Sequence, residues 1–279
     1  MGSLPEPKTA AGTAGLAALL DRPESALVAL DYDGTLAPIV PDPEKARAHS
    51  QAMPALARLA RRIGVVAVIT GRSAEAAVRL GGLDRAPGLE GLIVLGAYGA
   101  ERWDAATGAL RTPPPHPGVM SARAELPGLV RDTVPSDQAH IEDKGVALAV
   151  HTRRAADPAG TFQALHDPLD ALAARHGLTL EPGRFVLELR PPGADKGRAL
   201  TDLVRETGAT SVLYAGDDLG DLAAFDAVAR LREAGVPGLR VCSGSTEVAE
   251  LAEAADLTVD GPAGVVALLT ALSVALPPE

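Results

Sequence analysis

The chain has 279 residues, a formal net charge of −10 and a single cysteine, Cys242. Its length suits one large domain or two modest ones. An acidic chain lacks the clustered Lys and Arg that nucleic-acid and anionic-membrane surfaces require. One cysteine excludes an internal disulfide and a cysteine-cluster metal site, and no stretch is apolar for long enough to cross a bilayer. We therefore expect a cytoplasmic protein with no nucleic-acid or membrane partner.

The first part of the chain alternates short apolar runs with helical segments. The pattern predicts a strand at 26–30, a helix at 50–62, a strand at 65–69, a helix at 73–80 and a strand at 92–95. Ser73 is a candidate N-cap for the second helix. Strands that alternate with helices, each followed by small residues, are typical of βαβ units in a parallel sheet.

This alternation is interrupted between two proline-rich junctions, at 113–117 and 190–193. Both junctions are stiff, and neither fits the interior of a helix or strand. Between them the sequence predicts two helices and four short strands, at 119–130, 139–143, 146–152, 161–176, 178–180 and 185–189. We therefore expect a small α+β domain with an antiparallel sheet at 113–192.

After the second junction the alternation resumes. Helices are predicted at 196–207 and 221–231, strands at 211–215 and 239–242, and a last helix ends near residue 276. The predicted fold class is α/β, with a Rossmann-like parallel-sheet core formed by residues 1–112 and 193–279.

Asp31 and Asp33 come directly after the first predicted strand. Gly34 allows a sharp turn there, so both carboxylates can face one small volume at the carboxyl end of the sheet. Two close carboxylates are costly unless a cation or a shared proton neutralises them. The same residues would also fit an ordinary turn or a calcium-binding loop, so the pair alone does not decide between these alternatives.

Other strand ends also carry polar residues. Thr70 follows the second strand, Lys196 follows the insertion, and Asp217 and Asp218 follow the strand at 211–215. The carboxyl ends of parallel strands share one edge of a sheet, so these groups can converge. Hard oxygen ligands suit Mg²⁺, while a lysine and a hydroxyl suit a phosphoryl group. The combination indicates a site for a metal ion and a phosphate together.

Four groups of residues resemble, in order, the motifs of the haloacid-dehalogenase-like phosphatases: Asp31-Tyr32-Asp33-Gly34-Thr35, Thr70, Lys196 and Gly216-Asp217-Asp218. The resemblance spans most of the chain. It implies that Asp31 attacks phosphorus and carries an aspartyl-phosphate, and that Asp33 acts as general acid and then as general base. It also implies that Thr70 and Lys196 hold the phosphate.

The resemblance implies Mg²⁺ as the cofactor. The ion would be bound by the Asp31 carboxylate, the Asp33 backbone carbonyl and Asp217, with Asp218 as a further candidate. The family usually follows this last motif with Thr-Asp-Glu, and here only Asp221 keeps an acid of that run. Asp218 and Asp221 also lie where a helix begins, and acidic residues are favourable there for capping reasons alone.

The inserted domain resembles the cap of trehalose-6-phosphate phosphatases. Its segments 141–151 and 183–191 look like that family's cap strands, which implies that Glu142, Lys144 and Glu188 bind the sugar hydroxyls. A plain alternative is that Glu142 and Lys144 form an exposed charge pair. In the core, the same resemblance adds Asp31, Asp33, Tyr32, Gly71 and Arg72 as candidate substrate contacts, although Arg72 would also fit a solvated position at a helix start.

Together these features predict a monomeric, Mg²⁺-dependent phosphatase of trehalose biosynthesis that acts on a small phosphosugar, trehalose 6-phosphate. They leave open a functional link to a trehalose-6-phosphate synthase. Two alternatives remain. The substrate could be another phosphosugar, such as sucrose 6-phosphate or glucosylglycerate phosphate. The chain could instead be a non-catalytic phosphosugar-binding subunit of a synthase complex.

Overall fold

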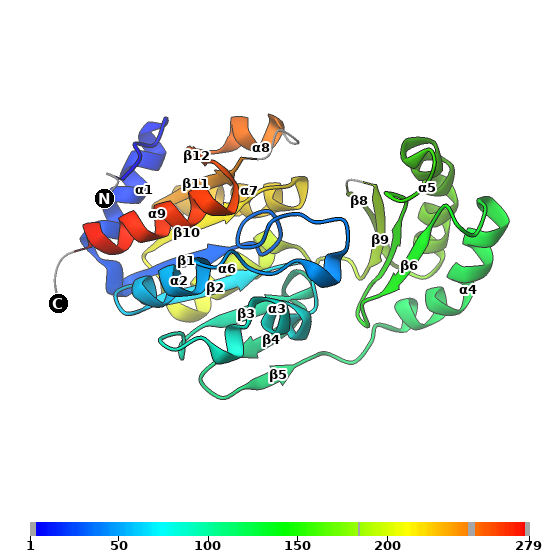
Figure 1. Cartoon of the computed structure of the whole chain (residues 1–279), viewed down its shortest axis with the longest axis horizontal. Coiled ribbons are helices and arrows are strands. Elements are labelled where there is room, and N and C mark those ends of the chain that lie inside the picture. The colour runs from blue at the N-terminus through cyan, green and yellow to red at the C-terminus, as the bar shows by residue number, and fades with distance from the viewer. Residues whose placement is uncertain (1–3, 184, 245–248, 277–279) are drawn as a thin grey trace. The chain divides into compact units, whose positions relative to one another are not determined.

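The computed structural model describes residues 4–183, 185–244 and 249–276. The chain divides into two compact units (Figure 1). The first combines Met1–Arg111 with Asp195–Glu279, and the second is Thr112–Ala194.

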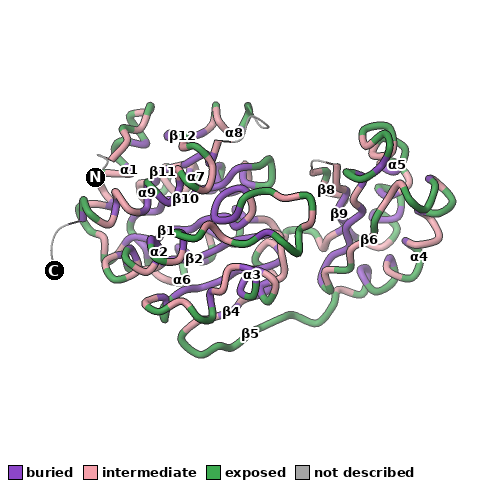
Figure 2. Tube along the Cα trace, viewed as in Figure 1, coloured by how far each residue is buried: buried purple, intermediate pink, exposed green. Residues whose placement is uncertain are grey.

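An eight-stranded sheet forms the centre of the first unit. Its order is β12 (Leu257–Val259), β11 (Gly238–Ser243), β10 (Ser211–Gly216), β1 (Ala26–Leu30), β2 (Val65–Ile69), β3 (Ile93–Gly96), β4 (Glu101–Asp104) and β5 (Ala109–Arg111). The first six strands in this order are parallel, and β4 and β5 add an antiparallel edge. All residues of β1 and β10 are buried (Figure 2), as expected for parallel strands covered on both faces.

Helices cover both faces of this sheet. Val28 and Leu30 face a core shared with α1 (Ala10–Asp21), α2 (Ala52–Ala60), α3 (Ala74–Gly81) and α9 (Gly261–Ala275). Leu27 and Ala29 face a second core shared with α6 (Lys196–Thr207), α7 (Leu222–Glu233) and α8 (Ala249–Ala254). Alternate residues of one buried strand therefore support two separate apolar layers. No helix in the described residues combines the length and hydropathy needed to span a membrane.

Short 3-10 turns connect several of these elements. They are η1 (Pro23–Ser25), η2 (Pro43–Lys45), η3 (Leu83–Arg85), η4 (Ala97–Gly99) and η5 (Leu219–Asp221).

A four-stranded antiparallel sheet forms the centre of the second unit. Its order is β6 (His140–Asp143), β7 (Leu148–His151), β9 (Val186–Arg190) and β8 (Thr179–Gly183). Helices α4 (Pro117–Thr133) and α5 (Pro158–Arg175) pack on one face through a core that includes Leu148, Val150 and Leu187. The antiparallel sheet expected in this region is present.

The predicted α/β architecture is confirmed, but some elements were not foreseen. Helix α4 begins at Pro117, a residue that the sequence pattern assigns to the linker. Proline is tolerated at this position because the N–H that it lacks would be unpaired in the first helical turn anyway. The hairpin β4–β5, strand β12 and helices α1 and α8 were also missed. Strand β12 has three residues and α8 has six, too few for a periodic pattern.

Asp256 anchors the N-terminal helix to the sheet. Its carboxylate is fully buried and accepts hydrogen bonds from the side chains of Arg232, Arg240 and Thr9. Thr9 is also the N-cap of α1. Burial alone would raise the pKa of Asp256, but hydrogen bonds from Arg240, Arg232 and Thr9 together lower it to about 2. The ordinary value is 3.8, and a shift of this size corresponds to about 2 kcal/mol of stability.

We predict that Asp256→Asn lowers the free energy of unfolding by at least about 2 kcal/mol at pH 7. A carboxylate whose folded pKa is depressed contributes fully above its unfolded pKa and loses that contribution as pH falls through its folded pKa. The difference between wild type and variant should therefore shrink between about pH 4 and pH 2. Urea unfolding across this range measures it, with the exposed Glu253→Gln as control. A difference that stays constant over this range would contradict the prediction.

Candidate active site

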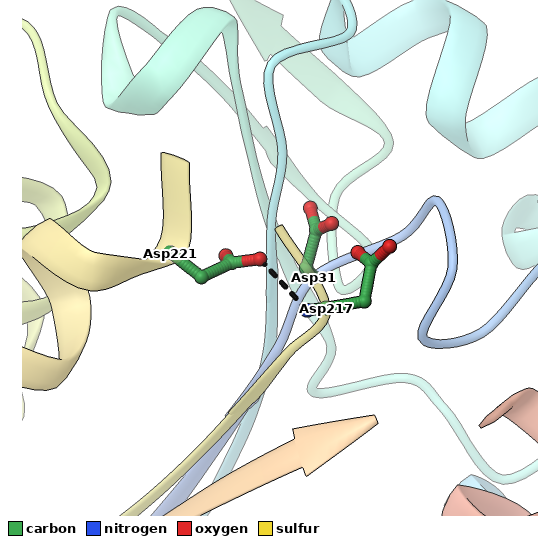
Figure 3. Close-up of side chains that lie close together, drawn as sticks. All are labelled: Asp31, Asp217 and Asp221. Atoms are coloured by element: carbon green, nitrogen blue, oxygen red, sulfur yellow. Dashed lines mark hydrogen bonds between the residues drawn. The ribbon is translucent and has the colours of Figure 1, made fainter. Parts of the chain in front are cut away.

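The predicted acidic cluster forms at the carboxyl ends of β1 and β10. Asp31 directly follows β1, and Asp217 directly follows β10, the strand paired beside it. The N–H of Asp31 donates to the carbonyl of Ala215 at 2.8 Å, so the sheet pairing continues up to the site. Carboxylate oxygens of Asp31, Asp217 and Asp221 lie within 4.8 Å of one another (Figure 3). All three residues are buried.

Two glycines leave the space that these carboxylates occupy. Gly34 has φ +68°, and a Cβ there would lie 1.9 Å from Oδ2 of Asp217. A Cβ on Gly216 would lie 2.2 Å from Cγ of Asp221. Both distances are far inside van der Waals contact, so the glycine of each motif is required sterically.

Lys196 supplies the positive charge within the cluster. It is the first residue of α6 and is almost fully buried. Its Nζ lies 3.0 Å from Oδ1 of Asp31 and 2.7 Å from Oδ1 of Asp221. One ammonium group against three carboxylates leaves two negative charges uncompensated when all are ionised. A divalent cation carries the matching charge.

The pKa values of the site report the same imbalance. Burial raises the pKa of Asp31 well above its ordinary value, even though Lys196 opposes the rise. Burial also raises the pKa of Asp217 to about 10, and the charges of Asp31 and Asp221 add to this effect. Two carboxylates in this position can both be ionised once a cation binds between them. The donor set, hard carboxylate oxygens, fits Mg²⁺.

Asp221 holds the cluster together through four hydrogen bonds. Its Oδ1 accepts from Nζ of Lys196 at 2.7 Å and from the hydroxyl of Tyr214 at 2.6 Å. Its Oδ2 accepts from the N–H groups of Asp217 at 2.9 Å and Asp218 at 3.1 Å. Burial opposes its ionisation, but Lys196 and these donors outweigh burial and lower its pKa. Both oxygens of Asp221 are thus committed to protein donors.

The two acids of uncertain role have different environments. Asp221 is fully buried and contacts Lys196, whereas Asp218 is exposed and precedes the turn η5 as its N-cap. Asp218 lies outside the three-residue group of close carboxylates. Its predicted metal role therefore stays a prediction.

Thr70, Arg72 and Asp33 form a second part of the site. Thr70 follows β2 and is buried, and its Oγ1 accepts from the N–H of Arg72 at 3.2 Å. The Arg72 guanidinium donates to both carboxylate oxygens of Asp33, at 2.6 and 2.7 Å. The Asp33 side chain is 35% exposed. The structure thus brings Arg72 to the predicted acid–base residue.

The turn that carries Thr70 and Arg72 is held by the next strand end. The N–H groups of Ala97 and Tyr98 donate to the carbonyls of Arg72 and Thr70, at 2.6 and 2.9 Å. Both Ala97 and Tyr98 have positive φ, which is unusual for residues with a side chain. A Cβ on Gly71 would lie 2.8 Å from the Tyr98 ring, so Gly71 makes room for that ring.

Two buried residues of the site were not predicted. Tyr214 donates to Asp221, as described above, and Ser243 at the end of β11 donates from Oγ to the carbonyl of Gly34 at 2.7 Å. Tyr214 is a polar group in a strand whose residues are all buried, and Ser243 is a buried polar group at the end of a strand that also carries the half-buried Arg240. In both cases a hydroxyl departs from the apolar pattern of its neighbours. Because a buried hydroxyl needs a hydrogen-bond partner, this departure from an apolar pattern could have singled them out.

In the second unit, the predicted sugar contacts lie on paired strands. Glu142, Ala149, Glu188 and Glu181 follow one another in register across β6, β7, β9 and β8. Nζ of Lys144 lies 2.9 Å from Glu188, and these side chains are only 14% and 5% exposed. Nε2 of His151 lies 2.8 Å from Glu142. Lys144 and Glu188 therefore form a shielded ion pair.

Comparison with known proteins identifies the family. The family model described as trehalose-phosphatase matches residues 29–262, more than half of the chain. The chain belongs to the trehalose-phosphatase family. Two curated trehalose-phosphate phosphatases are similar to it. The protein of Mycobacterium avium is 33% identical over 85% of this chain, and that of Mycobacterium bovis is 33% identical over 95%. The chain spans 59% and 64% of the length of these two relatives.

Solved structures of this family share the fold. The C-terminal domain of Candida albicans trehalose-6-phosphate phosphatase superposes with a TM-score of 0.76 at 22% identity, covering 98% of this chain and 99% of that one. A trehalose-6-phosphate phosphatase related protein superposes with a TM-score of 0.68 at 25% identity, covering 89% and 97%. A haloacid-dehalogenase-like hydrolase from Bacteroides thetaiotaomicron has a TM-score of 0.59 at 17% identity, covering 88% and 98%. The trehalose-phosphatase family is confirmed by the family model, and the solved structures of both groups confirm the fold.

The neighbouring acids Asp218 and Asp221 provide a matched test of what holds the site together. We predict that Asp221→Asn lowers the free energy of unfolding by about 3–5 kcal/mol, because it leaves Lys196 buried with one carboxylate partner fewer. Asp218→Asn should cost less than about 1 kcal/mol, since Asn keeps the turn cap and the fold does not favour the charge of Asp218, whose pKa it raises. Urea unfolding at neutral pH measures both values. Equal destabilisation by the two variants would contradict the distinction.

Proposed function

We propose that the chain is a phosphatase that hydrolyses trehalose 6-phosphate to trehalose and phosphate through an aspartyl-phosphate on Asp31. The observation that carries this proposal is the buried cluster of Asp31, Lys196 and Asp217 at adjacent strand ends, in a chain of the trehalose-phosphatase family. A site that only binds a phosphosugar needs no carboxylate beside the phosphate. A site that forms an aspartyl-phosphate needs one, because the carboxylate is the nucleophile.

In the first step, a carboxylate oxygen of Asp31 attacks phosphorus. The bond between phosphorus and the sugar oxygen breaks, and that oxygen receives the proton of Asp33. Lys196, 3.0 Å from Asp31, holds the nucleophile in place. Thr70 and Lys196 bind the phosphoryl oxygens, whose charge grows during the transfer. The products of this step are the free sugar and the acyl phosphate.

In the second step, Asp33 acts as the base. Its carboxylate takes a proton from a water molecule, and the water oxygen attacks phosphorus. The acyl–phosphate bond breaks, inorganic phosphate leaves, and the Asp31 carboxylate and protonated Asp33 are restored. One residue serves both steps because it ends the first step as the carboxylate that the second step requires.

Mg²⁺ would be held by the carboxylates of Asp31 and Asp217 and by the backbone carbonyl of Asp33, with Asp218 as a further candidate. The charge balance and the oxygen donors of the cluster support this proposal. When bound, the ion would offset the negative charge of the phosphoryl group and of the cluster.

We further propose that Glu142, Lys144 and Glu188 bind the sugar hydroxyls. Carboxylates accept from vicinal hydroxyls, and the ammonium group donates to them. Two of the three, Lys144 and Glu188, already form a shielded ion pair at 2.9 Å, so part of the site is preorganised. A site built on such bonds discriminates strongly against ligands that lack the hydroxyls.

The substrate and the nucleophile are tested together. Purified protein with Mg²⁺ should release phosphate from trehalose 6-phosphate faster than from sucrose 6-phosphate, glucosylglycerate phosphate or glucose 6-phosphate. Asp31→Asn should abolish release, because an amide does not form the acyl phosphate, while circular dichroism shows an unchanged fold. Faster release from another sugar would refute the assigned substrate. No release from any substrate, or activity retained in Asp31→Asn, would refute the proposed chemistry.

The sugar contacts are tested by comparing two substrates. We predict that Lys144→Ala and Glu188→Gln lower kcat/KM for trehalose 6-phosphate by about 10- to 100-fold, the loss typical of one hydrogen bond to a charged group. Hydrolysis of p-nitrophenyl phosphate, which lacks the sugar, should change far less. Glu125→Ala is a control, because Glu125 pairs with Arg175 elsewhere in the same unit. Equal losses on both substrates would exclude a role in sugar binding.

A further inference from the structure

Arg72 holds both carboxylate oxygens of Asp33. Its Nε donates to Oδ2 at 2.6 Å and its Nη2 donates to Oδ1 at 2.7 Å. Two parallel hydrogen bonds of this kind fix the plane of the carboxylate as well as its position. The Arg72 side chain is 14% exposed, so water competes little for these bonds. This is the geometry of a built contact and not that of a solvated surface arginine.

Arg72 is itself held on two sides. Its guanidinium carbon lies 5.7 Å from the ring centre of Tyr32, which is fully buried and donates from its hydroxyl to the carbonyl of Ala46 at 3.0 Å. The backbone of Arg72 donates to Thr70 and accepts from Ala97. Because these supports come from segments following three different strands, Arg72 has a fixed position relative to the sheet.

The backbone beneath Asp33 is fixed as well. The N–H of Gly34 donates to the carbonyl of Ala37 at 2.7 Å, and the carbonyl of Gly34 accepts from Ser243 at 2.7 Å. With the backbone fixed, only the side-chain torsions of Asp33 remain free. The pair with Arg72 restricts these torsions.

We propose that Arg72 is a positioning residue for Asp33 and thereby controls the transfer of the proton to the leaving sugar oxygen. This inference rests on the acid–base role of Asp33 in the proposed function. Both oxygens of Asp33 accept from Arg72, so the pair suits the carboxylate that remains after the proton has passed to the sugar oxygen. Arg72 then holds that carboxylate while it takes the proton of the attacking water.

Two substrates with different leaving groups can distinguish an arginine that positions the general acid from an arginine with another role. A sugar alkoxide leaves poorly and depends on the proton, whereas p-nitrophenolate leaves well without it. General acids contribute about 10²- to 10⁴-fold to rates. A residue that only binds the phosphoryl group, or only stabilises the fold, acts on both substrates alike.

The test compares kcat/KM for trehalose 6-phosphate and p-nitrophenyl phosphate in Arg72→Met, Asp33→Asn and the double variant. We expect Arg72→Met to lose about tenfold or more on the sugar phosphate, part of the general-acid contribution, and much less on the aryl phosphate. In the Asp33→Asn background Arg72→Met should cause little further loss, because the residue that it positions is already gone. Arg72→Lys, which keeps the charge but not the two parallel bonds, should resemble Arg72→Met on the sugar phosphate. Arg79→Met, whose arginine pairs with Glu44 on the surface, is the matched control.

Equal losses on both substrates, or a full further loss in the Asp33→Asn background, would overturn the inference and assign Arg72 to phosphate binding. Restoration of the sugar-phosphate rate by Arg72→Lys would overturn it as well, since charge alone would then suffice. If Asp33→Asn itself affects both substrates equally, the acid–base role of Asp33 fails first, and the inference fails with it. A failure of the proposed function is therefore distinguishable from a failure of the inference alone.

Discussion

The charge balance of one buried cluster governs the centre of this protein. Asp31, Asp217 and Asp221 share a volume with Lys196 at the ends of two neighbouring strands, and burial makes each unpaired charge expensive. Asp221 neutralises Lys196 and fixes the loop after β10 through two backbone N–H groups. Asp31 and Asp217 are left as the pair that still requires positive charge. Asp221 differs from the other two carboxylates in that both of its oxygens accept hydrogen bonds from two protein donors each.

The strand ends at this cluster could be predicted from the sequence because each stands beside a short buried apolar run. Parallel pairing then brings Asp31 and Asp217 together, and the structure confirms that pairing. The partners of the remaining polar groups could not be predicted. Nothing in the local pattern distinguishes Asp218 from Asp221, which differ in burial only once the turn η5 has formed. The contact between Arg72 and Asp33 depends likewise on how two loops pack.

The contacts between charged side chains of the second unit could not be predicted from the sequence either. Their identities were visible in the sequence, but the pairing of Lys144 with Glu188 depends on the strand order β6-β7-β9-β8. In that order Ala149 of β7 stands in register between Glu142 of β6 and Glu188 of β9, and Lys144 lies in the turn that follows β6. An alternating pattern gives the face of each strand but not the order of the strands. Which cation meets which carboxylate therefore required the structure.

The hydrogen bond from Ser243 to Gly34 joins residues 209 positions apart in the chain. Strand β1 has β2 on one side, but its other neighbour, β10, is synthesised only after the whole inserted unit. A growing chain therefore presents one edge of β1 unpaired while residues 112–194 emerge. An exposed, apolar edge of this kind favours pairing with other chains. If the insertion folds first as an independent unit, the effective loop that must close to pair β1 with β10 becomes shorter. Early folding of the insertion is therefore an advantage for assembly of the sheet.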